Sequence, residues 1–231
     1  CVHVSQSTAQ RGSEQLKREF NELKERWSTH QAVIDDLEIN IEKANAQWKQ
    51  FENDLTKHNE WFKFHEGIFR DQTLQGTLNE KEEQMKTYNT KRGDVMAYEG
   101  TIDDFVNHAH TLLQNSGAER LKPAITQISN RYQLLHVLSN EVVAKWQGLI
   151  EDHQAYSDKL KKRTDWLRDL EDKIERALKE PNIELKSDML QAVVAEKETA
   201  TSKINDVTAH GERLYPDTSA QGRDQIRQEL R

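Results

Sequence analysis

The sequence has little that would cross-link the chain, anchor it or interrupt a helix: one cysteine, three prolines and nine glycines among 231 residues. Cys1 has no partner for an internal disulfide, which fits a reducing compartment. No apolar run approaches the roughly 20 residues that cross a bilayer, and the N-terminus lacks the regions of a signal peptide. We expect a soluble, cytoplasmic excerpt of a longer chain, since it begins with Cys rather than Met.

An excess of positive charge is also missing. Acidic residues outnumber basic ones 40 to 33, and the net charge is −7. The two signs are interspersed, whereas nucleic-acid binders and membrane-bending helical dimers concentrate Lys and Arg on one surface. The longest basic cluster is predicted to be a solvated helix face: Lys159, Lys161, Lys162 and Arg163. We therefore expect no nucleic acid and no membrane insertion, and a membrane-bending dimer is the less favoured function.

Helical periodicity is what the sequence does contain. Charged residues make up 32 % and hydrophobic residues 35 % of the chain, a mixture that favours long amphipathic helices. Apolar residues keep a helical spacing from about residue 13 to about residue 70, with no proline before Pro123, which predicts one unbroken helix. Further stripes predict helices from Leu78 to about Gln114, from Leu121 through Ile174, from Ile183 to Leu214, and over 221–231.

Turn signals separate these helices. Thr77 and Glu80 have the spacing of a capping box after the break at 71–77, and Ser116 and Glu119 offer a second box before Pro123. Pro181-Asn182 and Tyr215-Pro216-Asp217 mark the later turns. Gly93 and Gly100 predict the weakest or most bent backbone within the second helix. Gly148 predicts slightly more flexibility in the third.

The sequence repeats itself with a period of 105 residues. Phe51, Leu55, Trp61 and Phe62 return at that distance as Tyr156, Leu160, Trp166 and Leu167. Trp27, after an arginine, returns as Tyr132, again after an arginine. A helix with a central tryptophan, a second helix and a third helix with this Arg-aromatic pair make up the unit. Repeats of this length indicate an array of similar helical units.

This pattern resembles the spectrin repeat, in which three antiparallel helices A, B and C form a left-handed bundle. The resemblance implies an all-α fold of tandem three-helix bundles, joined by continuous C-to-A helices into an elongated rod. Residues 1–44 would end a preceding repeat, 45–148 would form a complete repeat, and 149–231 would supply helices A and B and the start of C. The second unit is poorer in large apolar residues, so we expect it and the Gly93–Gly100 region to yield first under tension.

The resemblance is strongest to rods of giant cytoskeletal linkers, the nesprin family first, with dystrophin-like and plakin proteins behind it. It implies a non-enzymatic rod, spacer and protein-interaction segment that transmits force between distant domains. The expected partners are cytoskeletal proteins, with actin or nuclear-envelope links outside this chain and the full-length protein at the outer nuclear membrane. The alternative is docking or head-to-tail self-association through the partial repeats at the two ends.

The titratable residues predict no catalytic, cofactor or metal site, and no partner-binding residue can be singled out. His58 and His65 are two helical turns apart, too far to share one ion, and His108 and His110 lie on different sides of a helix. Pairs such as Asp35-Asp36 and Asp103-Asp104 have no concave pocket to separate their pKa values. No phosphate-binding, nucleophile-elbow or zinc-protease motif occurs, so we expect no enzyme and no cofactor.

Overall fold

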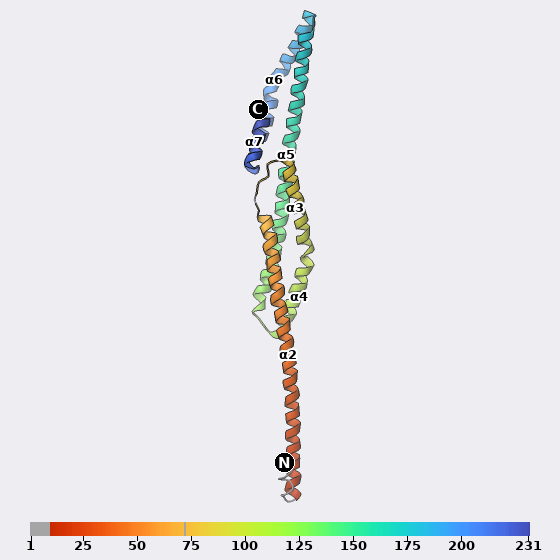
Figure 1. The fold of residues 1–231 in the computed structure, drawn as a ribbon, viewed down its shortest axis with the longest axis vertical. Helices are drawn as coiled ribbons and strands as arrows, with labels where there is room; N and C mark the ends of the chain where they lie inside the picture. Colours follow the sequence, from red (N-terminus) through yellow and green to blue (C-terminus); the bar gives the residue numbers. More distant parts are fainter. Residues whose placement is uncertain (1–9, 72) are drawn as a thin grey trace. The chain divides into compact units, whose positions relative to one another are not determined.

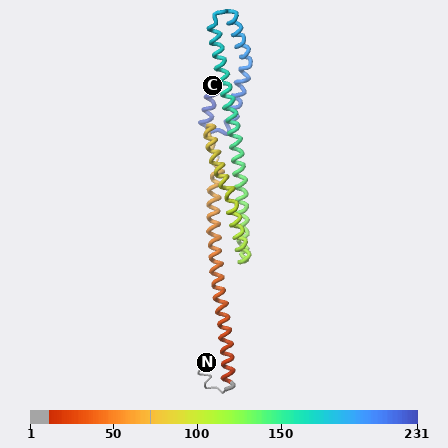
Figure 2. The backbone as a smooth tube through the Cα atoms, turned by 90° about the vertical axis from the view of Figure 1, so that its right-hand side faces the viewer, coloured from red at the N-terminus to blue at the C-terminus, as the bar shows by residue number. Residues whose placement is uncertain are grey.

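The computed structural model describes residues 10–71 and 73–231, and side chains from residue 12 onward. Every element within these residues is helical, which confirms the predicted all-α class with long helices packed together (Figures 1 and 2). The elements are α2 (Gln10–Arg70), α3 (Leu78–Ala97), α4 (Glu99–Ser116), α5 (Leu121–Lys179), α6 (Ile183–Arg213), the short 3-10 helix η1 (Tyr215–Asp217) and α7 (Ala220–Glu229). The number and limits of spectrin-type repeats stay a prediction.

The chain divides into two compact units, Cys1–Glu60 with Asp103–Gln127 and Trp61–Ile102 with Ile128–Arg231. In the first unit, Phe51 stacks on Phe105 with ring centroids 5.3 Å apart, and His58 meets the same ring edge-on at 4.6 Å. Arg120 lies over the Trp48 ring at 3.9 Å. These contacts pack α4 and the loop residue Arg120 against α2, so the core of this unit begins near residue 48.

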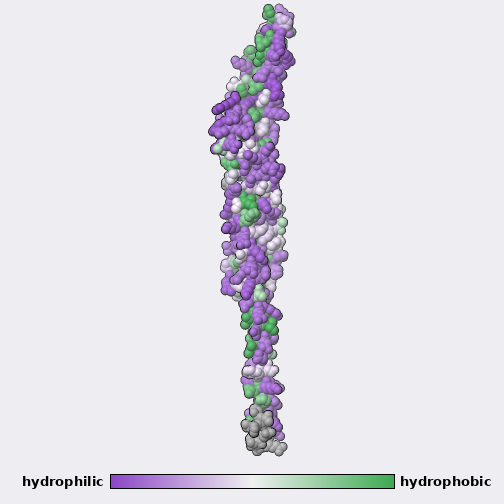
Figure 3. Space-filling model, in the orientation of Figure 1, coloured by the Kyte–Doolittle hydropathy of each residue, from purple (hydrophilic) through white to green (hydrophobic). Residues whose placement is uncertain are grey.

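The part of α2 before residue 48 carries exposed apolar side chains (Figure 3). Most of them follow the helical spacing that the sequence predicts: Phe20, Leu23, Trp27, Ile34, Leu37 and Ile41. An amphipathic stripe normally faces a core, so an exposed one is a surface that another helix can cover. None of the helices described is long and apolar enough to cross a membrane.

In the second unit, α2, α3 and α5 share a core around Tyr88. Its ring centroid lies 6.0 Å from that of Phe69 on α2 and 5.5 Å from that of Trp146 on α5. The Tyr88 hydroxyl donates to the Asp71 carbonyl oxygen at 3.2 Å, and the Tyr132 hydroxyl donates to the Val95 carbonyl oxygen at 3.2 Å. Each tyrosine thus buries an apolar ring while its hydroxyl stays hydrogen-bonded.

An ion pair at the edge of this core fixes the register of α2 on α5. Arg131 donates from Nε to Glu66 Oε1 at 2.7 Å and from Nη2 to Oε2 at 3.2 Å. The same guanidinium lies 5.1 Å from the ring centre of Phe62, which is fully buried. A forked arginine–carboxylate contact is directional, so it defines which turn of α5 faces which turn of α2.

Helix α5 continues without interruption past Gly148 into a second packing with α6 and α7. Its core is Tyr156, Val207, Leu214 and Ile226. Lys159 pairs with Asp206, and Lys173 pairs with Glu196, so the ion pairs follow α5 and α6 along their shared length. Arg163 also donates to the Glu229 carbonyl oxygen at 2.6 Å. Two of the four residues predicted to form a solvated basic cluster, Lys159 and Arg163, are therefore bonded to other helices.

Two local predictions are corrected. The helix predicted over 78–114 is divided at one residue, Tyr98, between Gly93 and Gly100, although the Tyr98 N–H still donates to the Asp94 carbonyl oxygen at 3.2 Å. Ser116 and Glu119 form no capping box: α4 extends to Ser116, whose hydroxyl donates to the Leu112 carbonyl oxygen. Gly117 then ends the helix with a φ of 62°, a conformation that glycine adopts without strain.

Candidate functional site

The strongest candidate for a functional site is the place where the start of α3 meets α5, the corner between α6 and α7, and α7 itself. We call it the junction; all its residues belong to the second unit. Figures 1 and 2 both show α7 beside the loop that leads into α3, although they are far apart in sequence. The junction is built from two helix caps, a glycine crossing and a cluster of buried polar side chains.

The predicted capping box before α3 is confirmed. The Thr77 hydroxyl accepts the Glu80 backbone N–H at 3.2 Å. The Glu80 carboxylate in turn accepts the N–H groups of Gly76 and Thr77, both at 2.9 Å. These bonds to the ionised form lower the pKa of Glu80. The loop entering α3 is thus held in one conformation, with Gly76 facing α7.

Gly76 and Gly222 let two stretches of backbone cross in contact. A Cβ atom on Gly222 would lie 2.4 Å from both the Cα and the carbonyl oxygen of Gly76. Next to the crossing, the Ser219 N–H donates to the Gln75 carbonyl oxygen at 3.3 Å, and Ser219 caps α7 by accepting the Gly222 N–H. Only glycine at 222 fits this approach, because backbone atoms cannot swing aside as a side chain can.

Lys81 joins α3 to the α6–α7 corner from inside. Its side chain is fully buried, and Nζ donates to the buried Thr218 hydroxyl at 3.4 Å. Thr218 donates onward to the Leu214 carbonyl oxygen at 2.7 Å. Burial lowers the pKa of Lys81, and the nearby carboxylates of Asp217 and Asp152 oppose that shift. Lys81 therefore ties α3 to the α6–α7 corner, because moving the two elements apart would break this buried hydrogen-bond network.

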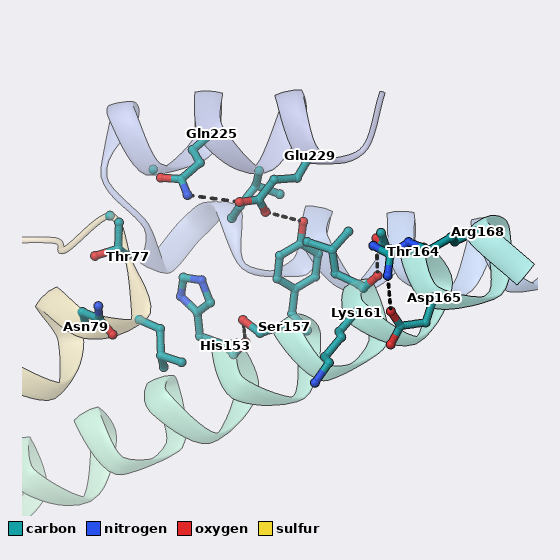
Figure 4. A pocket seen from close by; sticks show the side chains of 16 residues that line it. Thr77, Asn79, His153, Ser157, Lys161, Thr164, Asp165, Arg168, Gln225 and Glu229 are labelled. Carbon is teal, nitrogen blue, oxygen red and sulfur yellow. Dashed lines mark hydrogen bonds and ion pairs between the residues drawn. The ribbon is translucent and has the colours of Figure 1, made fainter.

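Tyr156 and Glu229 link α5 to α7 (Figure 4). The buried Tyr156 hydroxyl donates to Glu229 Oε2 at 3.0 Å, and Gln225 donates to the other carboxylate oxygen at 3.0 Å. Burial, followed by the bond to Glu229, raises the pKa of Tyr156. Burial and the charge of Lys81 lower the pKa of the neighbouring His153 to about 4, so its imidazole is neutral at pH 7.

A surface hollow of about 670 Å³ lies over these residues. Thr77, Asn79, His153 and Gln225 line it, and the rest of its wall comes from the same stretches of α3, α5 and α7. The carboxylate of Glu229 in this wall is already bonded to Tyr156 and Gln225. Within the hollow, the bond between Tyr156 and Glu229 holds α5 and α7 together.

The histidines considered as metal ligands serve packing in the structure. His58 and His65 are 6 % and 4 % exposed. The His65 ring lies against the Trp61 ring at a tilt of 32°, with the ring centroids 4.0 Å apart, and Nδ1 lies 2.9 Å from the Trp61 carbonyl oxygen. His108 is exposed and bonds within its own helix, and His110 is exposed. In residues 10–71 and 73–231, no three His, Cys, Asp or Glu side chains form a group that could hold a metal ion.

The paired carboxylates lie on the surface. Asp35, Asp36, Asp103 and Asp104 are all exposed. Sequence patterns did not predict the residues that build the junction: Gly222, Lys81, Thr218 and Tyr156 with its hydrogen bond. A serine three residues before Gly222 was the one local signal, because it marks a helix start.

Comparison with known proteins yields one informative similarity. No family model matches the chain, and no solved structure does. The chain is 41 % identical over 228 residues to the protein named Muscle-specific protein 300 kDa of Drosophila melanogaster. That match covers 99 % of this chain but only 2 % of the relative. Along nearly its whole length, the chain is thus homologous to a short part of a very large muscle-specific protein, which is consistent with a structural, cytoskeletal-type segment.

Proposed function

We propose that this chain is a non-enzymatic rod segment and spacer, which transmits force between distant domains of a cytoskeletal linker. The observation that carries the proposal is α5, a 59-residue helix shared by two helical packings. Tyr132 and Trp146 lie in the packing with α2 and α3, and Tyr156 lies in the packing with α6 and α7. A helix common to both cores transmits tension and bending without a loop between them.

The junction supports this function because it adds a second connection beside α5. The Gly76–Gly222 crossing and the Lys81–Thr218 bond join α3 to the α6–α7 corner. Bending α5 near Gly148 would have to separate these groups as well. Neighbouring units that share an interface also share stability, as in other linear repeats.

The larger protein is proposed to be a giant cytoskeletal linker of the nesprin kind, with dystrophin-like and plakin rods less favoured. The similarity to a very large muscle-specific protein supports a linker of this size. Cytoskeletal proteins would bind to the helical surfaces of this segment. Attachment to actin or to the outer nuclear membrane would come from parts outside the 231 residues.

Pulling the chain from its two ends with optical tweezers tests the spacer function. We expect discrete unfolding steps from folded bundles, and the first to involve α6 and the α3–α4 turn at Tyr98. Helix α6 has the weaker packing, since its Ile183 and Val194 are 83 % and 61 % exposed, and the helical segment 78–116 is divided at Tyr98. A smooth extension without steps would show that the segment carries no load as a folded structure, and would contradict the proposal.

A second candidate function is docking or self-association through exposed helical surfaces of the segment. It is favoured by the exposed apolar row on α2, where Leu23, Trp27 and Ile41 are between 60 and 72 % exposed. A row of this length on a single helix suits the groove between two other helices. This function is compatible with the first, since a spacer can also bind partners along its length.

A further inference from the structure

His153 lies buried in the junction with one ring nitrogen unsatisfied. The side chain is 7 % exposed, and its buried Nδ1 atom has no hydrogen-bond partner among the residues that the structure describes. Figure 4 shows the imidazole between the start of α3 and α7, in the wall of the hollow. A neutral imidazole can leave one nitrogen bare, whereas a protonated ring carries an N–H on both nitrogens and needs an acceptor for each.

The hydrogen-bond acceptor that α7 offers to His153 is already in use. One carboxylate oxygen of Glu229 accepts from Tyr156, and the other accepts from Gln225. The hydroxyl of Ser157, on the next turn of α5, donates to the His153 carbonyl oxygen. A protonated His153 ring would therefore have to compete with the bonds that hold α5 and α7 together.

Charged groups on α3, α7 and η1, and on α5 itself, surround His153. The fully buried Lys81 on α3 disfavours a second cation, and Glu229 on α7 favours one. Asp217 on η1 and Asp152 on α5 lie near Lys81 and offset part of its charge. Burial and Lys81 together outweigh Glu229, so the pKa of His153 is lowered from 6.5 to about 4.

A second buried histidine faces the junction from α6. His210 also has a buried Nδ1 without a partner, and the rings of His210 and His153 each lie 6.2 Å from the Tyr156 ring between centroids. Burial lowers the pKa of His210. The charged groups that face His210 are Arg213, Lys159, Asp152 and Asp206. Acid therefore adds positive charge on both sides of Tyr156, in a region that already buries Lys81.

We propose that the junction is an acid-sensitive lock, in which protonation of His153 separates α7 and the α6–α7 corner from α3. Separation exposes the charged ring and the Lys81 side chain to water, which removes the cost of burying two like charges. The contact of Tyr88 with Trp146 still holds α3 on α5, so α5 then joins the two helical packings alone. This regulation goes beyond the spacer function, and it holds whether or not the segment carries load.

The closed junction binds a proton at His153 more weakly than the open junction does. The closed form therefore has its full stability at neutral pH and loses stability as the pH falls from about 6.5 towards 4. Because each pKa unit is a tenfold difference in proton affinity, the opening constant should rise by about tenfold or more between pH 7 and pH 5.

Hydrogen exchange of the full chain at pH 7 and pH 5, corrected for the pH dependence of the intrinsic exchange rate, tests this lock. Protection of the α7 amides should fall by about tenfold or more in the wild type, while α3 amides beside Tyr88 keep theirs. His153→Leu removes the titrating ring, so α7 protection should lose most of its pH dependence, whatever its level at pH 7. His153→Gln should do the same while keeping a polar side chain.

His65→Gln is the matched control. His65 is as deeply buried in the same unit, but its Nε2 lies 3.9 Å from Asp94 Oδ2, a carboxylate that can accept the second N–H. In this variant α7 should lose protection at pH 5 as in the wild type. Equal wild-type protection of α7 at both pH values, or an undiminished loss in both His153 variants, would overturn the lock. Pulling at pH 7 reports on the spacer function independently, since His153 is neutral there.

Discussion

We expect Gly222→Ala to destabilise the second unit by about 3 kcal/mol or more, because the added methyl group clashes with backbone atoms, which cannot rotate away as a side chain can. The new methyl group would lie 2.4 Å from Gly76 Cα and from its carbonyl oxygen, and 2.6 Å from Thr218 Cγ2. To relieve the clash, α7 must move away from α3, which also pulls Thr218 from Lys81. Urea unfolding followed by circular dichroism measures the loss.

Gly148→Ala is the control for this substitution. It too replaces a glycine of the second unit, but nothing lies within 4 Å of the added carbon. In the middle of α5, alanine should stabilise the chain by roughly 0.5–1 kcal/mol, because it restricts the unfolded backbone. If Gly222→Ala were as stable as the wild type, the two backbones would not cross in contact as described.

Tyr88→Ala will destabilise the packing of α2, α3 and α5 by about 3–5 kcal/mol, the range for large-to-small changes of buried aromatic residues. The ring is 1 % exposed and contacts both Phe69 and Trp146, so its removal leaves a cavity between three helices. Tyr88→Phe keeps the ring and removes the hydroxyl with its bond to the Asp71 carbonyl oxygen, which should cost about 1 kcal/mol. Thermal unfolding of both variants separates packing from hydrogen bonding.

Phe64→Ala serves as the exposed counterpart. The Phe64 side chain is 59 % exposed on the same bundle, and its removal should change stability by about 0.5 kcal/mol or less. Equal losses for Tyr88→Ala and Phe64→Ala would mean that the core is not centred on Tyr88.

The long helices could be predicted because their causes are local. Apolar stripes, the near absence of proline, and caps such as Thr77 with Glu80 act within a few residues of each other. The end of the third helix before Pro181 follows in the same way. The turn at Tyr98 was indicated only by its flanking glycines, since neither Gly93 nor Gly100 shows by itself whether a helix bends or stops.

The junction could not be predicted, because its causes are distant in sequence. Lys81 and Thr218 are 137 positions apart, and an isolated lysine on an amphipathic helix normally points to solvent. In the sequence, Gly222 is an ordinary glycine near the start of a helix, and only its contact with Gly76 in the structure shows why glycine is needed there. Such contacts depend on how two helical packings meet, and no local pattern records that.

The repeat predicted which residues occupy equivalent positions, but equivalent residues have different neighbours in the structure. Trp61 stacks on Tyr98 with centroids 3.8 Å apart, whereas Trp166 lies under Lys203 at 4.5 Å. Both are half-buried, and the deeper core position belongs to the neighbouring Phe62. Equivalent residues therefore differ in the groups that lie over them.

Hydrogen exchange along α5 is the most direct test of a rod segment without a flexible joint. If α5 is one continuous helix, amides from about residue 142 to 156 should exchange as slowly as those beside Tyr132, with no gap at Gly148. This protection would arise from the helix itself and from the two cores that it joins. A fast-exchanging stretch around Gly148, flanked by protected segments, would show a hinge between two separate bundles and contradict the proposed force-transmitting helix.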